Sequence, residues 1–263
     1  YVYKKEVDMS LEIIFAEFGD RSISNQKWVG DLGRLDPTYS QVKKYFPNAK
    51  LTCYTDNSDM LNEYDDVEIR LVDEEANKKF DKSYREGSGK LKWGFHCCDY
   101  YQIQGLLNSK ADVAISMDSD LVFTSDGVKS LIPIIKKFGI CAPTNERQLV
   151  KNDGIYTRGN DGDYHIGEDE SMGNLLTYDL WWIGYHTKDS RGRKWLKEFC
   201  RLMETNPKRG PLQLSRAAWN TGVYPYSMPI QFGVGSGHIG CGNEIILHVG
   251  HTNVQDHYLE ERI

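Results

Sequence analysis

Two aspartates, Asp118 and Asp120, stand one residue apart at the end of the apolar segment 111–117. The apolar run predicts a buried strand over residues 112–117, so both carboxylates would lie at one edge of a sheet. Hard cations such as Mg²⁺ and Mn²⁺ prefer carboxylate oxygens and usually keep open positions for water and substrate phosphates. The pair therefore indicates metal-assisted chemistry on a diphosphate, and an ordinary turn after a strand is the alternative.

The segment Ile-Ile-Leu-His-Val-Gly-His, residues 245–251, places two histidines beside a glycine near the end of the chain. A histidine in an apolar strand is often a core residue. Mn²⁺, however, accepts a mixed shell of carboxylate oxygen and imidazole nitrogen. His248 is therefore a candidate third ligand, and His251 is a weaker one.

Three further polar segments are candidate sites. Glu168, Asp169 and Glu170 form an acidic cluster that either is a solvated loop or supplies a general base, which needs one carboxylate near the reacting carbon. A second pair of acids, Asp161 and Asp163, lies in a glycine-rich loop and is better explained by solvation. The glycine-rich segment 233–242 has no lysine and does not open a helix, which excludes a P-loop and favours a lid or a tight connection.

Size and composition describe a globular protein. The 263 residues suffice for one large α/β domain or two small ones, and the net charge of −6 with no long basic run argues against nucleic acid as a partner. No apolar run approaches membrane-spanning length. The six cysteines form no C-x-x-C motif, which indicates reduced, mostly buried thiols.

We expect a cytoplasmic location. The alternative is the Golgi lumen, if an N-terminal anchor has been removed, because the sequence begins at Tyr1 without Met.

Strands and helices alternate through the first half of the chain. This alternation predicts an α/β fold with a mainly parallel sheet flanked by helices, in which ligands bind beyond the carboxyl ends of the strands. The expected strands are 11–16, 50–54, 67–72, 112–117 and 139–142, and the expected helices are 38–46, 58–64 (one turn), 91–107 and 124–138. The second half predicts a long loop over 145–174, a strand over 175–186, a helix over 193–204 and a last strand over 244–249.

Residues 116–124, Ser-Met-Asp-Ser-Asp-Leu-Val-Phe-Thr, and residues 246–250, Ile-Leu-His-Val-Gly, resemble segments of the nucleotide-sugar-dependent glycosyltransferases of the GT-A fold. The pattern is most similar to that of the retaining α-glycosyltransferases, such as the fungal α-mannosyl- and α-galactosyltransferases and the xyloglucan xylosyltransferases. The resemblance implies a single Rossmann-like domain over 1–263, with a nucleotide-sugar half (1–143) and an acceptor half (144–263).

The resemblance also implies a reaction, the transfer of a sugar from a UDP- or GDP-linked donor to a hydroxyl of a glycan or glycoprotein. Mn²⁺ or Mg²⁺ would be held by Asp118, Asp120 and His248. The donor would contact Ala16, Phe18, Arg21, Lys92, Asp118 and Ser119. Loop 145–174 would order over the donor and exclude water.

The stereochemical course of the transfer stays open at this point. An inverting enzyme needs a base, for which Asp169 and Glu168 are the candidates. In a retaining enzyme Asp179 would instead steady the positively charged sugar.

Two other functions compete with a glycosyltransferase. A sugar-nucleotide pyrophosphorylase also acts on diphosphates over a parallel sheet, but it normally opens with a glycine-rich loop bearing Arg and Lys after its first strand. The corresponding segment here has only Gly19 and Arg21. A non-catalytic carbohydrate-binding module would use the abundant aromatic residues without turnover, and the two acids at 118 and 120 argue against it.

Overall fold

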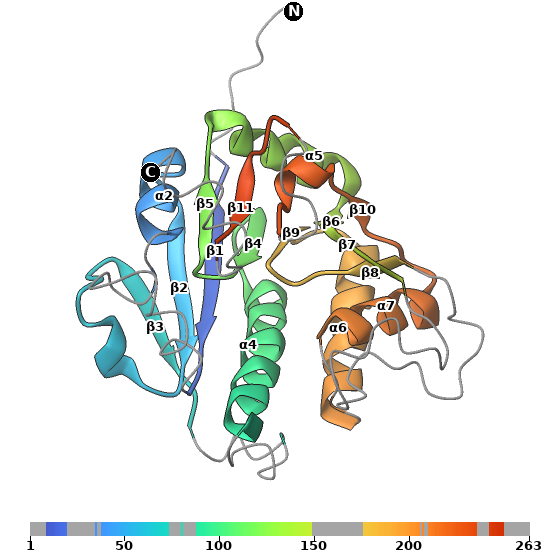
Figure 1. The fold of residues 1–263 in the computed structure, drawn as a ribbon, viewed down its shortest axis with the longest axis horizontal. Helices are drawn as coiled ribbons and strands as arrows, with labels where there is room; N and C mark the ends of the chain where they lie inside the picture. Colours follow the sequence, from blue (N-terminus) through green and yellow to red (C-terminus); the bar gives the residue numbers. More distant parts are fainter. Residues whose placement is uncertain are drawn as a thin grey trace, which may run out of the picture.

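A seven-stranded sheet forms the centre of the protein (Figure 1). The computed structural model describes residues 9–19, 35, 38–73, 80, 88–148, 176–205, 207, 210–235 and 242–249. The strand order is β10-β6-β9-β4-β1-β2-β3. These strands are β1 (Leu11–Glu17), β2 (Lys50–Thr55), β3 (Val67–Leu71), β4 (Val113–Met117), β6 (Ile140–Ala142), β9 (Trp182–His186) and β10 (Tyr226–Ser227).

The sheet is mostly parallel. Strand β1 pairs in parallel with β2 and β4, β2 with β3, and β6 with β10, whereas β9 runs antiparallel to both of its neighbours, β4 and β6. The carboxyl ends of β1, β2 and β4 therefore meet at one edge of the sheet, which is where ligands bind in open α/β sheets.

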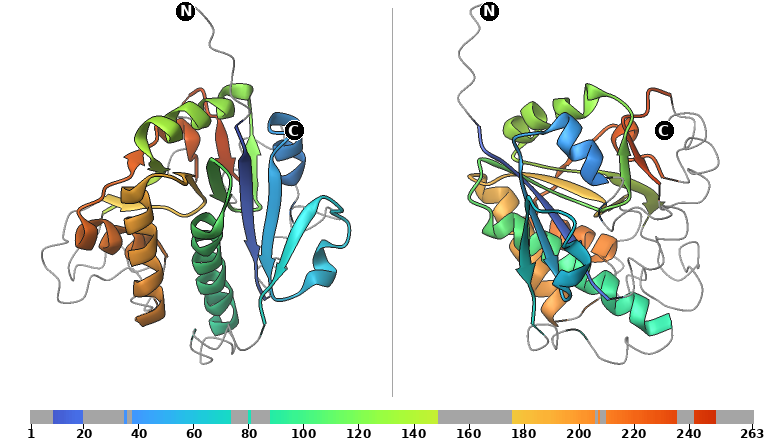
Figure 2. Two further views of the ribbon diagram at one scale, coloured as in Figure 1. Left: turned by 180° about the vertical axis from the view of Figure 1, so that it is seen from behind. Right: turned by 90° about the vertical axis from the view of Figure 1, so that its left-hand side faces the viewer.

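Helices cover both faces of the sheet (Figure 2). Alternate residues of β1 point to opposite faces, as the pleat requires. Ile13 and Phe15 pack with α2 (Thr38–Tyr45) and α5 (Leu131–Phe138). Ile14 and Ala16 pack with α4 (Ser88–Asn108), α6 (Ser190–Thr205) and α7 (Gly210–Thr221). Because both faces are buried, β1 and β4 are apolar along nearly their whole length, as is typical of parallel sheets.

Four short strands form two small sheets beside the central one. Strand β5 (Leu121–Phe123) pairs antiparallel with β11 (Ile246–His248), and β7 (Thr144–Gln148) pairs antiparallel with β8 (Leu176–Tyr178). Strand β5 follows directly on the predicted metal-binding segment and its partner β11 carries His248, so this pair is the part of the fold that matters most for the site.

The predicted mostly parallel α/β fold is confirmed, and most predicted elements of the first half agree within a few residues. Three expectations need correction. The single strand expected over 175–186 is two strands, β8 and β9, because the chain breaks at Asp179–Trp181. The helix expected over 124–138 begins as a 3-10 helix, Asp126–Ser130, which Ser125 caps through a hydrogen bond from Gly127 N–H, before α5. The loop expected over 145–174 begins within strand β7, and strands β5 and β10 and helix α7 were not predicted.

Among the described residues, no helix is long and apolar enough to cross a membrane. The five described cysteines, Cys53, Cys97, Cys98, Cys141 and Cys200, are all buried, as their distribution predicts. Cys241 lies outside the described residues. Burial raises the pKa of the Cys141 thiol to about 12, so this thiol stays protonated near neutral pH.

Candidate metal centre

Asp118 and Asp120 follow the carboxyl end of β4, where the sequence places them. The Asp118 N–H donates to the carbonyl of Trp181 (2.7 Å), which ties the start of this segment to the residue before β9. In β4, Ala114 packs in the cluster formed with α4, whereas Val113, Ile115 and Met117 pack on the opposite face. Continuing this alternation, Asp118 faces the side of the sheet that α4 covers.

His248 reaches the two acids through the pairing of β5 with β11. Their register sets His248 opposite Leu121, the residue after Asp120. The Val249 N–H also donates to the Asp120 carbonyl (2.9 Å), and the His248 N–H donates to the Val234 carbonyl (2.9 Å). The short strand β5 therefore brings a distant part of the chain beside the acids.

The three side chains converge on one point. His248 Nε2 lies 3.1 Å from Asp120 Oδ1 and 3.7 Å from Asp118 Oδ2. One ligand atom from each residue lies within 4.8 Å of the others. Two ligands at right angles around an ion with bonds of about 2.0–2.2 Å are themselves about 3 Å apart. The 3.1 Å spacing of His248 Nε2 and Asp120 Oδ1 matches this value, whereas the 3.7 Å spacing of His248 Nε2 and Asp118 Oδ2 is wider.

The donor set and the burial also fit a divalent cation. The side chains of Asp118, Asp120 and His248 are 11%, 7% and 16% exposed. Two carboxylates this buried and this close repel each other unless a positive charge lies between them. Two carboxylate oxygens and one imidazole nitrogen leave the remaining positions of a six-coordinate ion for phosphate oxygens or water.

The electrostatic environment of His248 is dominated by nearby aspartates. Burial works against the charged imidazolium, but Asp120, Asp118 and Asp179 outweigh burial and raise the pKa of His248 above its ordinary value. The imidazole ring lies against the indole of Trp181, with ring centroids 4.6 Å apart and an interplanar angle of 42°. This contact helps to hold the imidazole ring in position.

Two further residues, Gln102 and Thr38, make hydrogen bonds that position the site, and neither was predicted from the sequence. The side-chain amide of Gln102, on α4, donates to Asp118 Oδ1 (2.8 Å). The Thr38 hydroxyl, at the start of α2, donates to the Leu121 carbonyl (2.8 Å) and accepts from the Leu121 N–H (2.7 Å). Gln102 is a polar residue in the largely apolar stretch 100–107, but Gln104 is another, and nothing local marks Thr38.

The other predicted donor-binding residues are only partly described. Ala16 is buried near the end of β1. The Phe18 side chain is fully buried and stacks on Tyr101 (5.1 Å between centroids), so in this structure it presents no ring face to a base. Ser119 is buried between the two acids. Lys92 belongs to α4, but its side chain lies outside the described residues, as does Arg21.

Of the candidate catalytic acids, only Asp179 is described. Its N–H donates to the Pro143 carbonyl, and its Oδ1 accepts from the Leu180 N–H (2.9 Å). Asp179 lies close enough to His248 to favour the imidazolium electrostatically. Glu168, Asp169, the pair Asp161 and Asp163, His251 and most of loop 145–174 fall outside the described residues.

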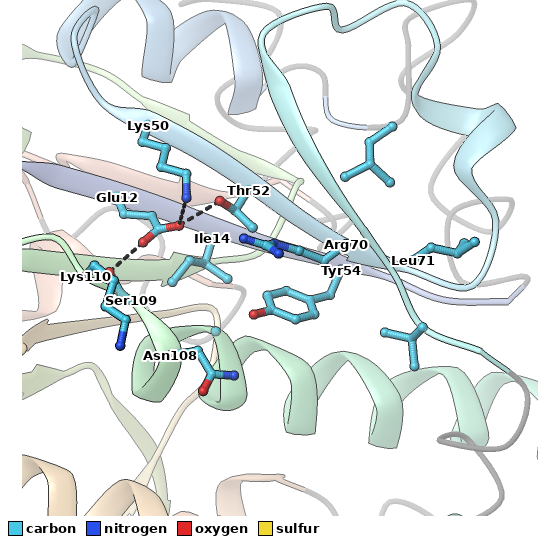
Figure 3. A pocket seen from close by; sticks show the side chains of 13 residues that line it. Glu12, Ile14, Lys50, Thr52, Tyr54, Arg70, Leu71, Asn108, Ser109 and Lys110 are labelled. Atoms are coloured by element: carbon cyan, nitrogen blue, oxygen red, sulfur yellow. Dashed lines mark hydrogen bonds and ion pairs between the residues drawn. The ribbon is translucent and has the colours of Figure 1, made fainter.

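A separate pocket of about 620 Å³ lies between the β1–β3 part of the sheet and the end of α4 (Figure 3). At its base the buried Glu12 carboxylate accepts from the Thr52 hydroxyl (2.7 Å) and the Ser109 hydroxyl (2.6 Å), and it pairs with Lys50 (3.1 Å). Lys50 also pairs with Glu68 (2.7 Å). Because Glu12 and Lys50 pair with each other at its base, we assign this pocket to the network that joins β1, β2 and α4.

Solved structures of glycosyltransferases share the fold. The galactosyltransferase LgtC in complex with donor and acceptor sugar analogs superposes with a TM-score of 0.52 and 12% identity, covering 90% of this chain and 86% of that one. The bifunctional glycosyltransferase WbbM gives 0.50 and 11%, covering 94% of this chain and 47% of that one. GlyE from Streptococcus pneumoniae TIGR4 gives 0.50 and 11%, covering 92% and 54%.

The sheet order and these similarities give the chain a GT-A-type glycosyltransferase fold, which confirms the expected fold. The chain spans about half the length of the WbbM and GlyE chains. No protein-family model matches the sequence, and no curated protein matches it in sequence.

Proposed function

We propose that this protein is a metal-dependent glycosyltransferase that moves a sugar from a nucleoside diphosphate sugar to a hydroxyl of a glycan or glycoprotein. The observation that carries the proposal is the convergence of Asp118, Asp120 and His248 at the carboxyl edge of the sheet. The glycosyltransferase fold of the whole chain supports the same reaction class.

Each residue of the centre has a role in this proposal. Asp118 Oδ2, Asp120 Oδ1 and His248 Nε2 would hold Mn²⁺ or Mg²⁺. The bound ion would neutralise the charge that grows on the diphosphate as the sugar leaves. The buried position of the two acids strengthens this electrostatic interaction, because little water screens it.

The proposed donor pocket adjoins this metal centre. Ala16 and Arg21 would line it at the end of β1, and Ser119 and Lys92 would border the diphosphate. Arginine binds phosphate through two parallel hydrogen bonds, whereas lysine acts as a point charge. Residues 1–143 would form the nucleotide-sugar half and residues 144–263 the acceptor half.

Both stereochemical courses stay within the proposal. Inversion would use Asp169 or Glu168 as the base that deprotonates the acceptor. Retention would use Asp179, whose charge already acts on His248, to steady positive charge on the sugar. The anomeric configuration of the product, measured by NMR, distinguishes the two. A cytoplasmic location, with the Golgi lumen as the alternative, remains a prediction that fractionation of cells would test.

The test is a screen of UDP- and GDP-sugars for slow hydrolysis in the presence of Mn²⁺. We expect release of nucleoside diphosphate from one donor, and we expect Asp120→Asn to lower the rate by at least about 100-fold because a charge that stabilises the leaving group is lost. Release of nucleoside triphosphate upon addition of pyrophosphate would instead indicate a pyrophosphorylase. Thermal stabilisation by free sugar alone, without turnover, would indicate a carbohydrate-binding module.

A further inference from the structure

Gln102 is a polar residue in a position that packing alone would give to an apolar one. It lies on α4, is 1% exposed, and is followed by the buried Ile103. Its amide nitrogen donates to Asp118 Oδ1 (2.8 Å), while its Oε1 is buried and has no hydrogen-bond partner among the described residues. A buried amide oxygen without a partner destabilises a fold, so the residue is poorly explained by stability.

The orientation of the amide follows from its chemistry. An ionised carboxylate only accepts hydrogen bonds, so the NH₂ group of Gln102 must face Asp118 and Oε1 must face away. One oxygen of Asp118 is therefore occupied by Gln102. The other oxygen, Oδ2, lies 3.7 Å from His248 Nε2 and faces the metal centre.

We propose that Gln102 is a positioning residue for the cation: its hydrogen bond locks the Asp118 carboxylate so that only Oδ2 is offered, as a single-oxygen ligand. This inference rests on the proposed function, because it assumes a cation at Asp118, Asp120 and His248. Hydrogen-bonded partners of ligating carboxylates orient those ligands in metal sites generally. A carboxylate held to one oxygen suits a small octahedral ion, whereas Ca²⁺ accepts two oxygens from one carboxylate and a larger, looser shell.

The experiment measures binding of Mn²⁺ alone to the full chain by electron paramagnetic resonance, with Ca²⁺ affinity obtained by competition. In Gln102→Leu and Gln102→Met the donor is lost and Asp118 is released to rotate. We expect Mn²⁺ affinity to fall roughly 10–100-fold. We expect Ca²⁺ affinity to fall much less, so the preference for Mn²⁺ over Ca²⁺ shrinks.

Gln104→Leu is the matched control, since it makes the same change two residues along α4, where the amide donates to the Tyr100 hydroxyl (3.0 Å) rather than to the site. Its affinities for both ions should equal those of the parent. Unchanged Mn²⁺ affinity in both Gln102 variants, or an equal loss for both ions, would overturn the proposed positioning role. If the parent chain and Asp120→Asn bind Mn²⁺ equally, the metal centre itself is wrong, and that outcome is distinct from a failure of Gln102 alone.

Discussion

His248 is the residue whose role is least obvious from its type, because a histidine in a short apolar strand is usually a core residue. Here its Nε2 lies within hydrogen-bond distance of Asp120, and its ring contacts Trp181. Three nearby aspartates raise the pKa of the imidazole and so favour its protonated form. A site with this much negative charge and one orienting aromatic ring is better suited to holding a cation than to packing alone.

If His248 is a ligand, His248→Ala removes the one nitrogen donor of the centre. We expect Mn²⁺ affinity to fall at least about 10-fold, and to fall more than Mg²⁺ affinity, because Mg²⁺ depends mainly on oxygen ligands. A titration of activity with each metal measures both effects. Identical metal titrations in the variant and the parent would return His248 to the status of a core residue.

Glu12 shows how a buried acid is stabilised away from the centre. Burial would raise its pKa, but hydrogen bonds from Ser109 and Thr52 and the Lys50 ammonium outweigh burial and hold the pKa of Glu12 below its ordinary value of 4.5. Since the folded pKa is lower than the unfolded one, the unfolded state binds more protons. The stabilisation is therefore complete above the unfolded pKa and is lost as pH falls through the folded pKa.

We therefore expect Glu12→Gln to lower the free energy of unfolding by about 1–3 kcal/mol near pH 7. The difference from the parent should shrink as the pH is lowered through the folded-state pKa of Glu12, because the parent carboxylate then also becomes protonated. Urea denaturation at several pH values measures this. A difference that does not change with pH would show that the charge of Glu12 does not stabilise the fold.

At the scale of elements, the site depends on the junction of α2, β5 and β11. Thr38 is fully buried and makes both hydrogen bonds to the backbone of Leu121, the residue that pairs with His248. A strand of three residues has little stability of its own, so its place is set by these contacts with its neighbours.

Thr38→Val keeps the shape of the side chain but leaves the buried N–H and C=O of Leu121 without the hydroxyl. We expect the free energy of unfolding to fall by about 1–3 kcal/mol for each group left unpaired. We also expect weaker Mn²⁺ binding, because Asp120 precedes Leu121 directly. Chemical denaturation and metal titration measure the two effects. Thr38→Ser keeps the hydroxyl and should retain both properties, so equal behaviour of the two variants would contradict this role.

Some of the strands and helices could be predicted from local sequence patterns, and others could not. The apolar runs at β1, β2 and β4 and the alternation with helices predicted the parallel sheet, because strands buried on both faces need continuous apolar residues. The strand expected over 175–186 was wrong at Asp179–Trp181, where the chain turns between two sheets. That break follows from tertiary contacts, such as the hydrogen bond from Asp118 N–H to the Trp181 carbonyl, which no local pattern encodes.

For the whole molecule, the sequence predicted that Asp118, Asp120 and His248 form one group, which the structure brings together, but it did not predict the residues that contact them. Asp118 and Asp120 were identifiable because a polar pair ends an apolar strand, and His248 because it stands beside a glycine in the last strand. Gln102, Thr38 and Trp181 come from other elements, and their contacts exist only once the sheet and helices have packed. Support residues of this kind carry no spacing rule that links them to the ligands.

The whole chain should be stabilised when the centre and the donor pocket are filled together. A ligand that binds only the folded state at 100 times its dissociation constant adds about 2.7 kcal/mol. For a protein of this size, that corresponds to an increase in Tm of roughly 5–10 °C. We expect this shift with Mn²⁺ plus UDP or GDP, and a smaller one with either alone. An increase in Tm with free sugar, but none with the metal and nucleotide, would favour a carbohydrate-binding module.

The central claim is that a divalent cation sits among two carboxylates and an imidazole next to the diphosphate of a donor. Crystals soaked with Mn²⁺ and nucleoside diphosphate, measured at a wavelength where manganese scatters anomalously, test it most directly. We predict one strong anomalous peak in contact with Asp118 Oδ2, Asp120 Oδ1 and His248 Nε2, and with phosphate oxygens on its open side. Bound nucleotide with no peak at these three atoms would contradict the account.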